Sequence, residues 1–107
     1  MAAELKQKGD AALGKQEYDA AIEAYTQAIA LDGKNHILFS NRSAAYLSKG
    51  DGELALDDAV KCIEINSTWP KGYTRKGAAL HKLQEYDDAI SAYEVKIYIL
   101  FKIMFIF

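Results

Sequence analysis

The chain of 107 residues has little that would stabilise a secreted protein: one cysteine, Cys62, and one proline, Pro70. A single cysteine excludes an internal disulfide, so nothing points to an oxidising compartment and we expect a cytoplasmic protein. The first ten residues, "MAAELKQKGD", contain no apolar segment of the kind that a secretory signal needs. The net charge of −2 gives no reason to expect a nucleic-acid or membrane-surface partner.

Motifs of catalysis and metal binding are missing as well. The chain has no nucleophile elbow, phosphate-binding loop or metalloprotease motif. The two histidines, His36 and His81, lie far apart in the sequence and have no cysteine or carboxylate at metal-ligand spacing. We therefore expect no enzymatic activity, no metal and no cofactor.

What the sequence does contain is a repeat. "EYDAAIEAY" occupies residues 17–25, and "EYDDAISAY" occupies residues 85–93. Midway between them, residues 51–59 read "DGELALDDA", a weaker copy in which Ala55 aligns with Ala21 and Ala89. Three copies at a period of about 34 residues predict an array of stacked repeats.

The local pattern within each repeat is helical. Apolar residues recur at helical spacing, and strand-like alternation is absent until the last residues. Segments rich in Gly, Asn, Asp and Ser interrupt this pattern at 14–17, 32–35, 48–52 and 66–70, the last ending in Pro70. These breaks predict helices at about 2–14, 18–31, 36–48, 52–65, 70–83 and from 86 onward. A helix pair of this size cannot bury its apolar face alone, so neighbouring pairs must stack.

The period and the repeated residues resemble the tetratricopeptide repeat (TPR). Small and aromatic residues stand at its pattern positions: Leu5, Gly9, Ala12, Ala21, Tyr25 and Ala28; Phe39, Ser43, Tyr46, Ala55, Ala59 and Cys62; Tyr73, Gly77, Leu80, Ala89 and Tyr93. The resemblance implies an all-α fold, with antiparallel helix pairs stacked as a right-handed superhelix. We expect a TPR domain over 1–94 with repeats at about 2–35, 36–69 and 70–94, the last one incomplete.

Three segments give a closer resemblance. "LKQKGDAAL", "NHILFSNRSAAY" and "WPKGYTRKGAAL" are similar to the N-terminal TPR domain of the Hop/stress-inducible co-chaperone family. This resemblance implies a non-catalytic adaptor that binds the acidic C-terminal tail, ending Glu-Glu-Val-Asp, of a heat-shock protein 70 or 90 chaperone. The sequence does not distinguish the two chaperones.

The chemistry of an anion site follows from the stacking. The first helix of each repeat faces the concave side, so Asn41 and Arg75, one repeat period apart, are expected in one row. Lys71 lies four residues before Arg75 on the same face, and Lys6 lies at the start of the array, with Lys82 at its far end. Charge-assisted hydrogen bonds of about 1.5–3 kcal/mol each could hold a peptide carboxylate with about micromolar affinity.

The family resemblance implies a carboxylate clamp of five residues, and Lys6, Asn41, Lys71 and Arg75 match it. The fifth position is Asp10, where the family has asparagine. An ionised aspartate accepts but cannot donate a hydrogen bond, and it repels a carboxylate. We therefore expect a weakened clamp, with Asp10 also able to pair with Lys6. Two alternatives stay open: a TPR module for another peptide, and a non-functional fragment that associates with itself.

Residues 95–107, "VKIYILFKIMFIF", do not fit the repeat. Eleven of these thirteen residues are apolar, a composition typical of aggregation-prone strands, and Lys96 replaces the small residue of the earlier repeats. Thirteen residues are too few to span a bilayer, which needs about 20. The tail consists mostly of residue types whose codons can be made of A and T alone. Its first codon, for Val95, begins with GT, the two bases that begin a splice donor. We therefore interpret this tail as a retained intron or an artefact of the gene model. It could cap the array or drive self-association.

Overall fold

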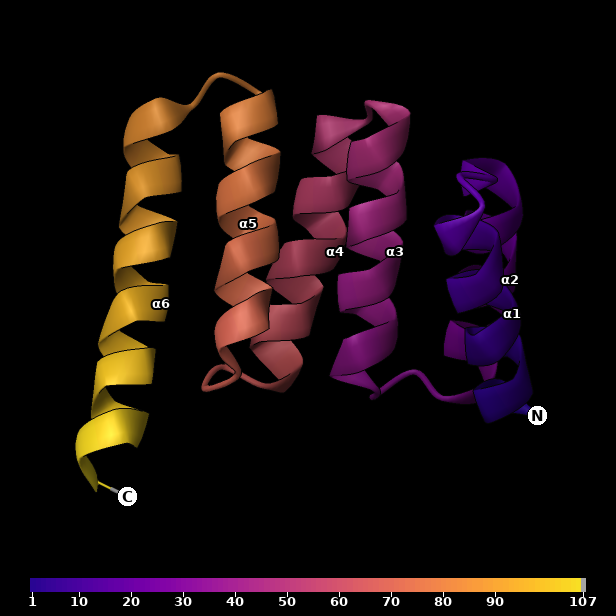
Figure 1. Ribbon diagram of the computed structural model, residues 1–107, viewed down its shortest axis with the longest axis horizontal. Coiled ribbons are helices and arrows are strands. Elements are labelled where there is room, and N and C mark those ends of the chain that lie inside the picture. Colours follow the sequence, from indigo (N-terminus) through magenta and orange to yellow (C-terminus); the bar gives the residue numbers. More distant parts are fainter. Residues whose placement is uncertain (107) are drawn as a thin grey trace.

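The computed structural model describes residues 1–106, which form six α-helices and no strand (Figure 1). The helices are α1 (Ala2–Gly14), α2 (Tyr18–Leu31), α3 (His36–Lys49), α4 (Gly52–Ile65), α5 (Pro70–Lys82) and α6 (Tyr86–Ile106). All six expected helices are present. Of the ends that were predicted, α3 ends one residue later and α5 one residue earlier than expected.

Consecutive helices form three antiparallel hairpins that stack side by side. Contacts join α1 to α2, α3 to α4 and α5 to α6 within the hairpins, and α2 to α3 and α4 to α5 between them. The first helices also touch one another, α1 with α3 and α3 with α5. Figure 1 shows the array from α1 and α2 at one end to α6 at the other. The predicted all-α repeat architecture is confirmed.

The turn inside each hairpin uses the same backbone conformation. Gln16, Gly50 and Gln84 stand at one repeat position and have φ angles of 62°, 100° and 64°. This left-handed region is the natural place for glycine, and only Gly50 indicated it in the sequence. The turns between hairpins are built differently: the Oδ1 atom of Asn35 accepts a 3.0 Å hydrogen bond from the N–H of Ile37 and so caps α3.

Cys62, Ala28 and Trp69 contribute to packing between the helices. Cys62 and Ala28, which share one repeat position, are completely buried, and burial raises the pKa of the Cys62 thiol to about 11. Trp69 is the N-cap residue of α5 and packs edge-on against the ring of His36, with 4.7 Å between the ring centroids. These positions therefore serve the fold.

The two helices of each hairpin are matched in side-chain size. A Cβ atom on Gly9 would lie 2.5 Å from Cε1 of Tyr25, and one on Gly77 would collide with the ring of Tyr93 in the same way. In the middle hairpin the pair at these two positions is Ser43 and Ala59, and the Ser43 hydroxyl instead donates a 2.7 Å hydrogen bond to the backbone oxygen of Ala55. In both outer hairpins a large aromatic side chain thus faces a residue without a side chain.

We expect Gly9→Ala to lower the free energy of unfolding by about 1–3 kcal/mol because the added methyl overpacks the buried Tyr25 ring. This loss should exceed the roughly 1 kcal/mol that alanine gains over glycine inside a helix. Gly14→Ala is the control, since a Cβ there meets nothing within 4 Å. Urea denaturation followed by circular dichroism measures both; equal stability of the two variants would contradict the steric argument.

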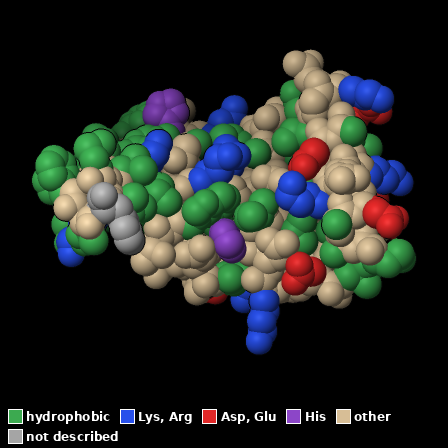
Figure 2. All heavy atoms as spheres, turned by 60° about the horizontal axis from the view of Figure 1, so that its bottom comes forward, with side chains coloured by type: hydrophobic (Ala, Val, Ile, Leu, Met, Phe, Trp, Pro, Cys, Tyr) green, Lys and Arg blue, Asp and Glu red, His purple; other side chains and the backbone are tan. Residues whose placement is uncertain are grey.

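The tail does not form a strand. Residues 95–106 continue α6 as helix. The helix continues in spite of the strand-like composition because no glycine or proline interrupts it. Figure 1 shows this end of α6 extending beyond the other helices, and Figure 2 shows hydrophobic side chains gathered at the same end of the molecule. No helix within residues 1–106 combines the length and apolar character needed to cross a membrane. Residue 107 of the tail lies outside the described residues.

Candidate functional site

The five candidate clamp residues all lie on the first helices of the hairpins. α1 carries Lys6 and Asp10, α3 carries Asn41, and α5 carries Lys71 and Arg75. Because α3 touches both α1 and α5, the three helices form one continuous surface. We call the part of it made by Lys6, Asp10, Asn41, Lys71 and Arg75 the clamp face.

Asp10 is the centre of a hydrogen-bond network on this face. Its Oδ2 atom accepts a 2.9 Å bond from Nζ of Lys6, the ion pair expected from their spacing. Its Oδ1 atom accepts a 2.5 Å bond from the hydroxyl of Tyr25 and a 3.2 Å bond from Nδ2 of Asn41. The network joins α1, α2 and α3, and it engages two of the donors that a ligand carboxylate would use.

The network also determines the charge of Asp10. Partial burial acts to raise the pKa of its carboxyl group, but the hydrogen bonds from Tyr25 and Lys6, the charge of Lys6 and the Asn41 amide together hold that pKa below its ordinary value. Burial, and then the bond to Asp10, raise the pKa of the Tyr25 hydroxyl, which therefore stays a donor. Asp10 is ionised at neutral pH.

The clamp-face residues on α5 make fewer hydrogen bonds than those on α1 and α3. Arg75 is partly buried, which lowers the pKa of its guanidinium, and its Nε atom donates a 3.2 Å hydrogen bond to the hydroxyl of Ser40 on α3. Lys71 is exposed, and within residues 1–106 it makes no hydrogen bond or ion pair. Lys82 is exposed at the last turn of α5, eleven residues from Lys71, and takes no part in the network.

Three cations and one carboxylate thus share the clamp face. Lys71 can present all its N–H donors to an anion, and Arg75 all but the one bound to Ser40, whereas Lys6 and Asn41 each already give one N–H to Asp10 and lie beside its negative charge. The sequence predicted that these five residues share one face, but it did not predict the contacts of Ser40 or of the Tyr25 hydroxyl, because Tyr25 appeared only as a position of the repeat pattern. Their roles depend on contacts between helices that no local spacing reveals.

A second polar cluster was missed entirely. Nε and Nη2 of Arg42 donate hydrogen bonds of 2.7 and 2.8 Å to the two oxygens of Asp58, and Nη1 donates one of 3.1 Å to Oγ1 of Thr26. The cluster joins α3 to α4 and α2, and the guanidinium also lies over the rings of Phe39 and Tyr46. Asp58 occupies the repeat position that holds Ala24 and Ala92 in the other repeats, and this replacement of a small residue by a carboxylate was the sequence signal for the cluster.

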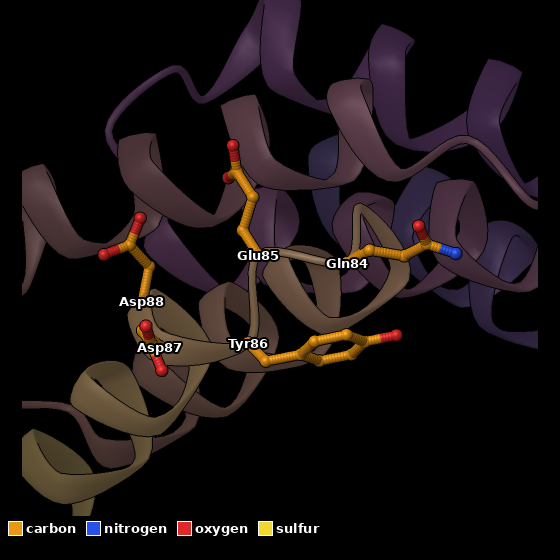
Figure 3. Close-up of a pocket in the computed structure, with 5 residues that line it drawn as sticks. All are labelled: Gln84, Glu85, Tyr86, Asp87 and Asp88. Carbon is orange, nitrogen blue, oxygen red and sulfur yellow. The ribbon is translucent and has the colours of Figure 1, made fainter.

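The turn between α5 and α6 forms a hollow with a different character. Figure 3 shows the side chains that line it: Gln84, Glu85, Tyr86, Asp87 and Asp88. Three of the five are carboxylates, so this hollow is unsuited to an acidic peptide. The clamp face is the better candidate for a ligand of that kind.

Stacked helical hairpins with a polar face on their first helices define a helical-repeat binding protein. Comparison with known families makes the class specific: a family model described as "Serine/threonine-protein kinase BSK1-like, TPR repeats" matches residues 1–77, and one described as "Tetratricopeptide repeat" matches residues 70–94. The chain belongs to the tetratricopeptide repeat family.

Individual relatives are similar over most of the chain. The "Heat shock protein sti1 homolog" of Schizosaccharomyces pombe is 58% identical over 94 residues, which are 88% of this chain and 16% of that protein. The first TPR of Spaghetti (RPAP3) bound to the HSP90 peptide SRMEEVD is 33% identical with a TM-score of 0.89, covering 92% of this chain and 78% of that one. The second TPR domain of human RPAP3 in complex with the HSP70 peptide SGPTIEEVD is 32% identical with a TM-score of 0.88, covering 92% and 82%. The chain thus spans about one sixth of the curated relative's length.

Proposed function

We propose that this chain is a non-catalytic co-chaperone module of the cytoplasm, whose clamp face binds the acidic C-terminal tail of a heat-shock protein 70 or 90 chaperone. Lys71 and Arg75 hold carboxylates of the tail directly. Lys6 and Asn41 contribute the N–H donors that Asp10 does not use, and contribute fully when Asp10 releases them. The observation that carries this proposal is the gathering of these donors from α1, α3 and α5 on one continuous surface.

The similar proteins support the proposal. The relatives include the sti1 homolog and an "Hsp70-Hsp90 organizing protein" of Triticum aestivum. The two RPAP3 domains were solved with the peptides SRMEEVD and SGPTIEEVD, both of which end in Glu-Glu-Val-Asp. A chain with the same fold and a cationic face suits the same kind of ligand.

The test is fluorescence polarisation with a labelled SRMEEVD peptide, prepared as the free acid and as the C-terminal amide. We expect the free acid to bind and the amide to bind about tenfold more weakly or worse, because amidation removes a charged acceptor whose hydrogen bonds are worth about 1.5–3 kcal/mol each. Lys71→Ala and Arg75→Ala should weaken the acid and leave the amide nearly unchanged. Equal binding of acid and amide would contradict a carboxylate clamp.

The same titration separates the alternatives. Binding that does not depend on the terminal carboxylate favours a TPR module for another kind of peptide. Absence of binding to both SRMEEVD and SGPTIEEVD peptides favours a fragment without this ligand. A difference between the two peptides would identify the preferred chaperone.

We also propose that the repeat domain ends near residue 94 and that residues 95–107 come from a retained intron or an incorrect gene model. The TPR match that ends at residue 94 and the break in the repeat pattern at Lys96 support this proposal. Sequencing of mature messenger RNA across the Glu94 codon tests it. Abundant spliced message that reads continuously into the tail would contradict it.

A further inference from the structure

One face of α6 is exposed to solvent, although the corresponding faces of α2 and α4 are covered by the next hairpin. The second helices α2 and α4 each contact two neighbours, their own hairpin partner and the first helix of the next hairpin. Among the described residues, α6 contacts only its partner α5. The side of α6 that corresponds to the stacking surface of α2 and α4 therefore faces solvent.

The side chains on this side still have the character of a stacking surface. Ile90 and Ile97 occupy the repeat positions of Ile22 and Ile29 in α2, which are partly buried and pack against the core of the first hairpins. On α6 the same positions are 56% and 64% exposed. Apolar residues thus occupy positions that no neighbouring helix covers.

The tail extends this surface along the whole of α6. Large apolar side chains recur at spacings of three, four and seven residues, which places them on one side of a helix. We call this set the α6 stripe; its members, each between 51% and 72% exposed, are Tyr86, Ile90, Ile97, Phe101 and Met104. Figure 2 shows hydrophobic side chains crowded at this end of the molecule.

We propose that the α6 stripe is covered by the α6 stripe of a second copy of this chain, with the two helices antiparallel about a two-fold axis near Val95. Val95 lies midway between Tyr86 and Met104, so this arrangement overlays the stripe on itself. Five side chains that each expose about 100 Å² give about 1,000 Å² over both copies, the lower limit for a specific interface. The dimer is therefore weak and forms in the micromolar range.

The helix dipoles favour the antiparallel arrangement. Antiparallel packing opposes the dipoles of the two α6 helices, whereas a parallel pair would align them.

Other occupants fit less well. The exposed residues of α1 are mostly polar and include Glu4, Gln7 and Lys8, so the opposite end of the array offers no large apolar side chain of α1 on which α6 of another copy could stack. A membrane-surface helix needs a polar side rich in Lys and Arg. α6 has two lysines against three carboxylates, so it lacks that basic side.

Sedimentation velocity of the full chain from about 1 to 100 µM tests the proposal. We expect a concentration-dependent shift from monomer to dimer, and at least a tenfold weaker dimer for Ile97→Glu and for Phe101→Glu. Leu31→Glu is the matched control, because Leu31 is 57% exposed but lies on α2 outside the α6 stripe. It should dimerise like the unchanged chain. Circular dichroism should show the same helix content in all variants.

A chain that stays monomeric at about 100 µM, or an Ile97→Glu variant that dimerises normally, overturns the proposal. Flotation of a monomeric chain with vesicles of phosphatidylcholine and phosphatidylserine would assign the stripe to a membrane surface instead.

Discussion

Replacing Asp58 with alanine is expected to lower the free energy of unfolding by about 3–5 kcal/mol, the cost of leaving a buried charge without its partner. Asp58 is 5% exposed, and both of its oxygens accept hydrogen bonds from Arg42. In its absence the guanidinium would keep only Thr26 as a hydrogen-bond partner and would remain between the helices. The pair raises the pKa of Arg42, with the hydrogen bond to Asp58 as the main cause, so the arginine stays charged at neutral pH.

Urea denaturation at neutral pH measures this loss. Asp19→Ala is the matched control, because Asp19 pairs with Lys49 at 2.6 Å on the exposed surface and such pairs are worth about 0–1 kcal/mol. Asp58→Asn keeps one acceptor oxygen and should fall between the two. The double variant Arg42→Leu with Asp58→Leu should regain much of the stability, since it removes both charges together. An Asp58→Ala variant as stable as Asp19→Ala would refute the structural role of the pair.

The second large effect concerns binding. On the proposed function, Asp10→Asn is expected to tighten binding of the free-acid SRMEEVD peptide by about 10- to 100-fold, or roughly 1.4–2.8 kcal/mol. The substitution removes a carboxylate that repels the ligand and releases Lys6 and Asn41 from the network. The new amide nitrogen can also donate to the incoming carboxylate. The amidated peptide should gain much less.

A double-mutant cycle identifies the source of this gain. In a Lys6→Ala background, Asp10→Asn should tighten binding less, because no Lys6 is left to release. The same gain in both backgrounds would show that repulsion alone had been removed. No gain in either would mean that Asp10 does not restrain the clamp.

Asp10→Asn should also flatten the dependence of stability on pH. The pKa of Asp10 is lowered in the folded chain, so its ionised form favours folding. That contribution is present above the ordinary pKa of an aspartate and is lost as the pH falls through the lowered value. Thermal unfolding between neutral and acidic pH should therefore show a smaller drop for the variant than for the unchanged chain.

The helices could be predicted from sequence because each break carries its own local chemistry. Asn35 and Asp51 cap helices, and Pro70 begins one, so the boundaries follow from nearest neighbours. That the five candidate clamp residues lie on one face could be predicted because a period of about 34 residues aligns equivalent positions. The resemblance to a known family selects them among the residues of that face, and their role as a clamp stays a prediction. Both inferences use the sequence pattern alone.

The environment of those residues could not be predicted in the same way. That Tyr25 and Asn41 converge on Asp10 depends on how closely α2 and α3 approach α1, a distance that spacing does not contain. The Arg42–Asp58 pair likewise joins two helices through a carboxylate whose counterparts in the other repeats are alanines. The tail is helical although its composition favours a strand, because it continues α6 without a helix-breaking residue. Strand propensity depends strongly on context and does not by itself determine the structure.

The size matching inside the hairpins limits how such an array can be rearranged. If α3 replaced α1 opposite α2, the side chain of Ser43 would stand where Tyr25 requires empty space. If α4 replaced α2 opposite α1, Ala59 would leave that space unfilled. Exchange of single helices is therefore penalised in both directions, whereas a whole hairpin carries its own complement with it. Duplication, loss or engineered recombination of this chain should succeed in steps of one complete hairpin.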